Sequence, residues 1–261
     1  MTDKKTLTPE ALSIIDAYKG LSFGGTCTVS TPYMNNKRQQ VRAALRVLIG
    51  KGSSEEIVEE ATLIALRENT DLTKMNEKDL RTFLIDHNLG IDCSGLVYHV
   101  LTAEYRTRYK KSLSTILSFV YAKNIIRKML SRFRPIENTN VSTLAHEKNS
   151  TPILLKDISP GDLIAAIEAK GFGTPNHILI VHEVTYVDNL LSSFSYTHSL
   201  RWKTDDTLTH GVRQGTVTII NEDKSILEQR WEEQGHVGEK NQTLALLLSS
   251  NAVSLLRLKQ K

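Results

Sequence analysis

The stretch Asp92-Cys93-Ser94-Gly95-Leu96-Val97 decides the fold of this 261-residue chain, because it places one of the two cysteines where a helix should begin. The preceding Asn88-Leu89-Gly90-Ile91 is typical of a loop that ends in a short extended segment. Apolar residues then recur at helical spacing, at Leu96, Val97, Val100 and Leu101. We therefore expect Cys93 to lie in the first turn of a helix.

A thiol at the start of a helix is expected to be reactive. Unpaired backbone N–H groups and the positive end of the helix dipole stabilise a thiolate there, so the position predicts a lowered pKa for Cys93. Ser94 and Gly95 are small enough to let a substrate carbonyl approach the sulfur. The alternative is a buried, inert cysteine, which is what we expect of Cys27.

The sequence downstream of the helix predicts three strands. A Pro160-Gly161 turn leads into an apolar strand over residues 163–166, and a strand over residues 177–184 begins with a histidine. Asp188-Asn189 is typical of a two-residue hairpin turn, so residues 190–199 should return as a third strand.

Three polar residues follow one another on these elements: Cys93 on the helix, then His177 and His198 on the strands. Together they can supply a nucleophile, a base and an orienting residue, in chain order. Cys93 would attack a carbonyl, His177 would move the proton, and His198 would fix the tautomer of His177. Tyr196 and Ser199 are alternatives to His198, because a one-residue change of hairpin register reverses the face.

Three motifs together carry a resemblance to a known family: D-C-S-G-L-V at residues 92–97, S-P-G-D-L at 159–163 and N-H-I-L-I-V at 176–181. In this order they resemble the NlpC-type cell-wall cysteine peptidases, a branch of the papain-like superfamily. The resemblance covers roughly residues 89 to 258, with 253–258 as the closing strand. It implies an α+β, papain-like core whose antiparallel sheet packs on the nucleophile helix.

The resemblance also implies an activity and its residues. Relatives hydrolyse amide bonds, typically in peptidoglycan stem peptides, which makes a peptide or muropeptide the expected substrate. By this resemblance Cys93 is the nucleophile, His177 the base and His198 the third member of a Cys-His-His triad. Asp92 and Ser94 match positions that shape the substrate site in relatives.

The chain departs from the family pattern in two ways. The family has a tyrosine shortly before the cysteine that helps to stabilise the oxyanion, but here that interval is helical sequence. The nearest equivalent is Tyr33, some sixty residues upstream of Cys93, and we take it as a candidate substrate-binding residue. The intervals from Cys93 to His177 and from His177 to His198 are also longer than in compact relatives. Long loops are tolerated but reshape a cleft, so the substrate can differ.

Residues 1–88 form a predicted helical region ahead of the thiol hydrolase domain at 89–261. Thr8 can cap a helix over 9–18, Ser53 and Glu56 fit a capping box that opens a helix through Arg67, and further helices are expected over 36–49 and 76–87. Gly50-Lys51-Gly52-Ser53 lacks the spacing of a phosphate-binding loop. The region is expected to pack on the core and cover one end of the cleft.

A helical insertion is expected over residues 104–150, and its part over 104–134 is strongly basic. This part has a single acid, Glu104, and nine basic residues: Arg106, Arg108, Lys110, Lys111, Lys123, Arg127, Lys128, Arg132 and Arg134. It predicts an amphipathic helix, broken once. Such a helix can pack on the core with a solvated face, meet an anionic polymer or membrane surface, or bind a partner.

Composition limits the remaining classes. A net charge of +4 is too mild for a dedicated nucleic-acid-binding protein, and 40% hydrophobic residues support a real core. Two cysteines argue against a disulfide framework, and no metal-ligand cluster stands out, so no metal or cofactor is expected. With no signal peptide and no long apolar run, the chain as written predicts a cytoplasmic protein. A peptidoglycan substrate would then need export by another route, a removed leader or an intracellular muropeptide.

Two classes of function are therefore compared. The first is a cysteine-dependent amide hydrolase, which predicts that Cys93, but not Cys27, alkylates quickly below pH 7. The second is a non-catalytic binding protein on the same fold, favoured if Cys93 and His177 lie too far apart to hydrogen-bond. A thiol acyltransferase or deamidase would use the same triad, because cleft shape and dryness decide the acceptor.

Overall fold

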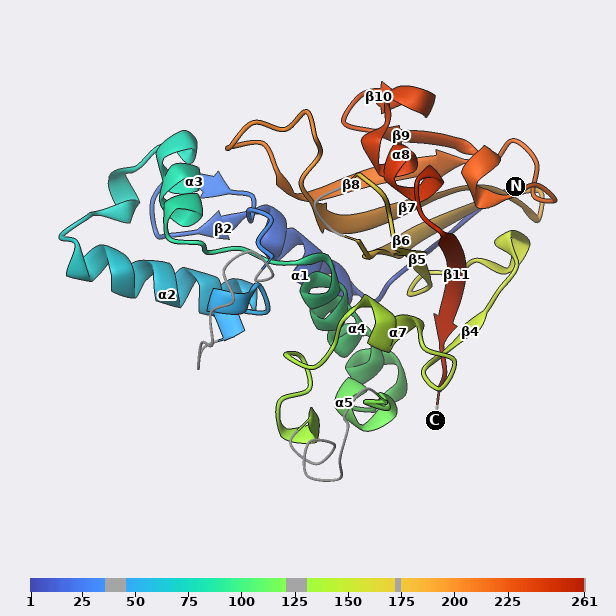
Figure 1. The fold of residues 1–261 in the computed structure, drawn as a ribbon, viewed down its shortest axis with the longest axis horizontal. Coiled ribbons are helices and arrows are strands. Elements are labelled where there is room, and N and C mark those ends of the chain that lie inside the picture. The colour runs from blue at the N-terminus through green and yellow to red at the C-terminus, as the bar shows by residue number, and fades with distance from the viewer. Residues whose placement is uncertain (36–45, 121–130, 172–174, 261) are drawn as a thin grey trace.

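The fold is α+β, built around a nine-stranded sheet whose described pairings are all antiparallel (Figure 1). The computed structural model describes residues 1–35, 46–120, 131–171 and 175–260. The order along the sheet is β10-β9-β8-β7-β6-β5-β11-β4, and β1 pairs with the far end of β6. The predicted α+β class with an antiparallel sheet is therefore confirmed.

The strands of this sheet are β1 (Thr2–Thr6), β4 (Ser150–Pro152), β5 (Leu163–Ile167), β6 (His177–Val187), β7 (Leu190–Leu200), β8 (Gly211–Thr218), β9 (Arg230–Glu233), β10 (His236–Val237) and β11 (Ala252–Leu258). A separate pair is formed by β2 (Leu21–Ser22) and β3 (Thr28–Val29). Asp188 and Asn189 join β6 to β7 with φ values of 50° and 66°, as a type I′ hairpin turn requires. The three predicted strands and the closing strand are all present.

The α-helices are α1 (Pro9–Lys19), α2 (Ser54–Arg67), α3 (Glu77–Asp86), α4 (Cys93–Tyr109), α5 (Leu113–Ile116), α7 (Val141–Ala145) and α8 (Gln242–Leu248). Short 3₁₀ turns lie at Arg46–Ile49, Leu72–Lys74, Leu155–Asp157, Ile226–Glu228 and Gly238–Lys240. No helix in the described part of the chain combines the length and apolar content needed to cross a membrane.

Helix capping fixes the starts of the N-terminal helices where the sequence places them. The side chains of Thr8 and Asn76 accept hydrogen bonds from backbone N–H groups of α1 and α3, and Ser53 and Glu56 form the predicted capping box of α2. Of the helix expected over 36–49, residues 36–45 lie outside the described residues, and 46–49 form a 3₁₀ turn instead.

The central helix α4 begins at Cys93, as predicted, and Asp92 caps it by accepting a 2.6 Å hydrogen bond from the Gly95 N–H. It packs against α1 on one side and against β6 and β7 on the other. A Cβ atom on Gly95 would lie 2.7 Å from the carbonyl oxygen of Gly50. Gly95 therefore serves close packing of the loop before α2, in addition to any role in substrate approach.

The basic insertion differs from the predicted helix. The described part starts inside α4, stops at Lys110 in the left-handed conformation (φ 55°), and continues as the single turn α5. Leu113 and Ile116 are buried in the core, and Glu104 is buried while it accepts hydrogen bonds from Thr8 and Arg108. Three of the nine basic residues, Lys123, Arg127 and Lys128, lie outside the described residues. The helix expected over 104–134 with one break is instead interrupted twice among the described residues, at 110–112 and at 117–120.

The sheet separates two hydrophobic clusters. One lies between the sheet and α1 to α4, and it contains Ile178 and Ile180 of β6; the other lies on the α8 face and contains Leu179 and Val181. This alternation follows from the strand pleat. Residues on both sides of position 88 contribute to the first cluster, and β1 belongs to the sheet. The predicted boundary therefore divides two stretches of sequence that share one core.

Candidate active site

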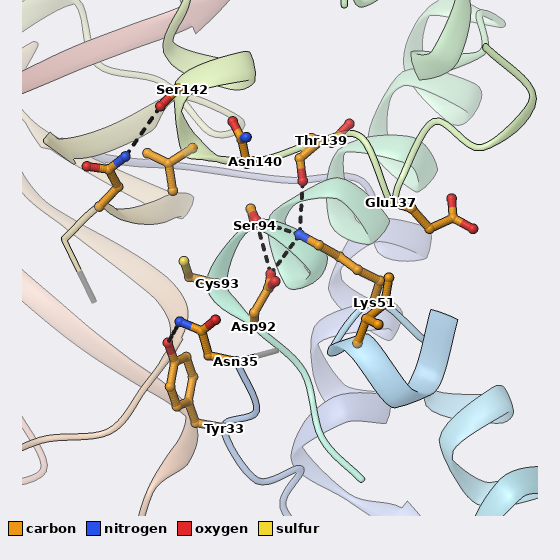
Figure 2. Close-up of a pocket in the computed structure, with 13 residues that line it drawn as sticks. Tyr33, Asn35, Lys51, Asp92, Cys93, Ser94, Glu137, Thr139, Asn140 and Ser142 are labelled. Carbon is orange, nitrogen blue, oxygen red and sulfur yellow. Dashed lines mark hydrogen bonds and ion pairs between the residues drawn. The ribbon is translucent and has the colours of Figure 1, made fainter. Parts of the chain in front are cut away.

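Cys93 opens into a polar cavity of about 490 Å³ at the N-terminus of α4 (Figure 2). Only 5% of the residue is exposed. The cavity is lined by the loop before α2, by α7 and the segment ahead of it, and by residues that precede β6. A small ligand can therefore reach the sulfur, which is buried but not enclosed.

Lys51 crosses one wall of this cavity, and its ammonium has three hydrogen-bond acceptors. It donates to the carboxylate of Asp92 (2.9 Å), the hydroxyl of Ser94 (2.6 Å) and the backbone carbonyl of Thr139 (2.9 Å) (Figure 2). Lys51 itself is 6% exposed. We call Lys51, Asp92, Ser94 and the Thr139 carbonyl the lysine cluster. It holds both neighbours of Cys93 in place.

Tyr33 lines the same cavity, although it lies far from Cys93 in the sequence. A bridge with Ile91 and a hydrogen bond from its N–H to His210 Nδ1 (3.1 Å) fix its backbone. Its hydroxyl accepts a 3.0 Å hydrogen bond from the side chain of Asn35 (Figure 2). The structure thus brings the candidate residues Tyr33, Asp92 and Ser94 together around Cys93.

His177 and His198 form a second polar group, which is buried on the α8 face of the sheet. His177 Nε2 lies 2.7 Å from His198 Nδ1, and His198 Nε2 lies 3.0 Å from an oxygen of Glu233. None of the three is more than 1% exposed. We call His177, His198 and Glu233 the histidine relay. Glu233 was not predicted from the sequence.

Further hydrogen bonds hold Glu233. The hydroxyls of Tyr196 (2.7 Å) and Thr243 (3.0 Å) donate to the same carboxylate oxygen, and the guanidinium of Arg213 lies 3.7 Å from the other oxygen. Burial opposes ionisation, but His198, Tyr196 and Arg213 together hold the pKa of Glu233 below its usual value. The relay therefore ends in a carboxylate. Tyr196, one of the predicted alternatives to His198, does not contact His177 through a hydrogen bond but donates one to the carboxylate of Glu233.

The carboxylate fixes the tautomers of both histidines. An ionised Glu233 only accepts hydrogen bonds, so the hydrogen between it and His198 sits on His198 Nε2. When His198 carries no second hydrogen, its Nδ1 has a lone pair that accepts from Nε2–H of His177. Nδ1 of His177 is left as a lone pair, and this buried atom has no hydrogen-bond partner among the described residues. His177 is thus set up as a proton acceptor.

Cys93 and the relay lie on opposite faces of the sheet, separated by the backbone at the start of β6. Side chains alternate between the faces of a strand, so His177 lies on the same face of β6 as Leu179. Cys93 packs with Ile178 on the opposite face. The β6–β7 ladder ends at Ile180 and Thr197, and beyond it the N–H of Ile178 hydrogen-bonds toward the Cys93 sulfur. In the described residues no hydrogen bond joins the sulfur to Nδ1 of His177.

The predicted lowering of the Cys93 pKa is wrong for this conformation. Burial raises the pKa to about 12 and the carboxylate of Asp92 adds to the rise, while Lys51 and the N–H groups of Ile178 and Ser94 only partly oppose it. Burial, followed by the neighbouring His198 and Arg213, holds the pKa of His177 well below its usual value. Both residues are therefore neutral at pH 7. The start of α4 at Cys93 agrees with the sequence prediction, whereas the burial of the Cys93 side chain is a finding of the structure.

The described residues hold no group of three His, Cys, Asp or Glu side chains arranged to bind a metal ion. What they present is an uncharged thiol, a histidine whose Nδ1 has no hydrogen-bond partner among them, and a cavity of about 490 Å³ beside the thiol. Searches of protein-family models, of curated proteins and of solved structures found no match to this chain.

Proposed function

We propose that this protein is a cysteine-dependent amide hydrolase, with Cys93 as nucleophile and His177 as base, oriented by His198 and Glu233. The observation that supports this most is the buried Nδ1 of His177, which has no hydrogen-bond partner among the described residues and lies at the end of a relay anchored by a carboxylate. Leaving a buried polar atom without a partner costs about 1–3 kcal/mol. Catalysis is one of the reasons for which such atoms persist.

The relay suggests the course of the reaction. Nδ1 of His177 takes the proton of the thiol while the sulfur attacks the carbonyl carbon of an amide. The C–N bond then breaks, His177 returns its proton to the leaving amine, and a thioester remains on Cys93. Water, activated by the same Nδ1, hydrolyses the thioester to a carboxylic acid. Glu233 stabilises the imidazolium that exists between these steps.

The sulfur and Nδ1 must approach for this reaction. In the resting pair both groups are neutral and not hydrogen-bonded, so proton transfer has to accompany the attack rather than precede it. Catalytic hydrogen bonds are often long before substrate binds and shorten in the complex.

The motif order extends the proposal to a papain-like, NlpC-type fold and to peptidoglycan stem peptides as the first substrates to test. A role of the basic residues of 104–134 at an anionic polymer or membrane surface stays a prediction. Hydrolysis and transfer to an amine share every step up to the thioester, so an acyltransferase or deamidase activity belongs to the same proposal.

A specific observation favours a second candidate, a non-catalytic binding protein. The missing Cys93–His177 hydrogen bond and the raised pKa of the Cys93 thiol are expected of a site that has lost its catalytic activity. In that case the polar cavity beside Cys93 would be a docking site for a peptide, and the relay would only hold strands β6 to β9 together.

One experiment separates the two candidates. The wild-type protein and Cys93→Ala are incubated with stem peptides, muropeptides and peptide amides, and the products are identified by mass. Cys27→Ser is the matched control, because it removes the other thiol. Products from wild type and Cys27→Ser, but not from Cys93→Ala, would support the hydrolase. Identical profiles for all three proteins would rule it out.

A further inference from the structure

The lysine cluster places a fixed positive charge directly beside the nucleophile. Lys51 is buried, its ammonium lines the cavity, and it contacts the residues on both sides of Cys93. An ammonium has three hydrogens, and each has an acceptor here. The three acceptors thus make a cation site that the chain fills with its own lysine.

Because the Lys51 ammonium occupies these acceptors, it limits which charged groups of a substrate can bind beside Cys93. A substrate ammonium would find these three acceptors already occupied by Lys51, so it would lose its hydration without gaining a partner, which is costly. A substrate carboxylate would find no hydrogen available on Lys51 without breaking one of its bonds. The positive charge is also balanced by Asp92, so the pair offers little net attraction to either sign.

The rest of the described lining includes the apolar Ile49 and Val141 beside polar side chains, and its charges are balanced. Glu137, the other charged residue there, pairs with Arg134 at 3.1 Å. Hydroxyl and amide side chains make up most of the remainder, at Tyr33, Asn35, Thr139, Asn140, Ser142 and Asn176. Amides and hydroxyls both donate and accept, which suits a neutral amide group.

From this arrangement we infer that Lys51 is a specificity residue: the cavity takes a neutral amide segment next to the attacked carbonyl and rejects a free ammonium. The inference rests on the proposed function and narrows it to substrates whose reacting acyl group carries no amine nearby. Internal peptide segments, capped peptides and side-chain carboxamides all meet this requirement. Their products differ, because a carboxamide releases ammonia and a peptide bond releases an amine.

The test uses matched dipeptide anilides that differ only at the N-terminus, free in one and acetylated in the other, together with a glutamine-containing peptide for ammonia release. For the wild-type protein we expect kcat/KM of the acetylated anilide to exceed that of the free amine by at least about tenfold. Lys51→Met leaves Asp92 and its neighbouring acceptors in place, so the preference should fall by about tenfold or reverse. Lys74→Met is the matched control, since Lys74 forms a surface pair with Asp71 at 2.9 Å.

A second variant covers the case in which Lys51→Met does not fold. Lys51→Ala with added n-propylammonium, a soluble copy of the missing side chain, should regain both the melting temperature and the preference for the acetylated anilide. Wild-type turnover that favours the free amine would overturn the inference but leave the hydrolase intact, provided that it depends on Cys93.

Loss of the proposed function would be visible separately. If no substrate is turned over in a Cys93-dependent way, binding of the same two anilides to wild type and Cys93→Ala is measured by calorimetry. Tighter binding of the acetylated form would still support the role of Lys51. Equal binding, tighter binding of the free amine or no binding would overturn it.

Discussion

Two polar groups flank Cys93, and they differ in how completely their hydrogen bonds are satisfied. In the lysine cluster every hydrogen of the ammonium has an acceptor. In the histidine relay the chain of bonds ends at Nδ1 of His177, which has none among the described residues. A saturated group can hold structure and exclude charge, whereas an unsaturated one can accept a proton. We therefore assign selectivity to the first group and chemistry to the second.

Removing the proton acceptor should have the largest effect. His177→Ala is expected to reduce Cys93-dependent turnover by at least about 10³-fold, as for other nucleophile–base pairs that act as a unit. Release of product is followed by mass on the best substrate of the panel. His182→Ala is the control, because His182 lies on the same strand and contacts Thr197 instead. Equal turnover by His177→Ala and wild type would remove the relay from the mechanism.

The far end of the relay should matter next. Glu233→Gln keeps the shape but removes the charge that fixes both tautomers, so we expect kcat to fall by about 10²-fold or more. The amide can donate to His198, which would turn the lone pair of His177 away from Cys93. Glu232→Gln is the matched control on the same strand, with an exposed side chain. A change confined to stability, with an unaltered pH profile, would make Glu233 merely structural.

The third test concerns the resting thiol itself. Because the pKa of Cys93 is raised to about 12, the thiolate is rare at neutral pH, and its fraction should rise about tenfold per pH unit below that value. In Cys27→Ser, iodoacetamide should therefore modify Cys93 at least about tenfold more slowly at pH 7 than it modifies free cysteine. The rate should keep climbing through pH 10. A plateau below pH 7 would restore the lowered pKa expected from the helix position.

Much of the scaffold was predictable because its signals are local. Thr8, Ser53 and Asn76 cap their helices through backbone groups within three residues, and the Asp188-Asn189 turn joins adjacent strands. The start of α4 at Cys93 follows from the same kind of signal. Such features depend on a few neighbouring residues, which a single sequence displays.

The parts that the sequence did not reveal depend on distant contacts. Glu233 reaches His198 across 35 residues, through two further strand pairings whose register no local pattern fixes. Lys51 lies in a glycine-flanked loop, and nothing nearby indicates that it would be buried against Asp92. The pKa of Cys93 was mispredicted for the same reason, since burial is a property of the whole fold. Strand β1, whose five residues are all exposed and include two lysines and two threonines, lacks the alternation of apolar residues by which a strand can be predicted.

The smallest expected effect concerns the lysine cluster, in which every hydrogen of the Lys51 ammonium has an acceptor. Ser94→Ala removes one of the three acceptors of the Lys51 ammonium, and a buried donor that loses its partner costs about 1–3 kcal/mol. We expect that loss in the free energy of unfolding, measured by urea denaturation, with turnover changed by less than about tenfold. Ser54→Ala is the matched control: its buried hydroxyl has no partner among the described residues, so removing it should cost little. A loss of turnover like that of Glu233→Gln, without a loss of stability, would mean that the lysine cluster takes part in the chemistry and that the division between the two groups is wrong.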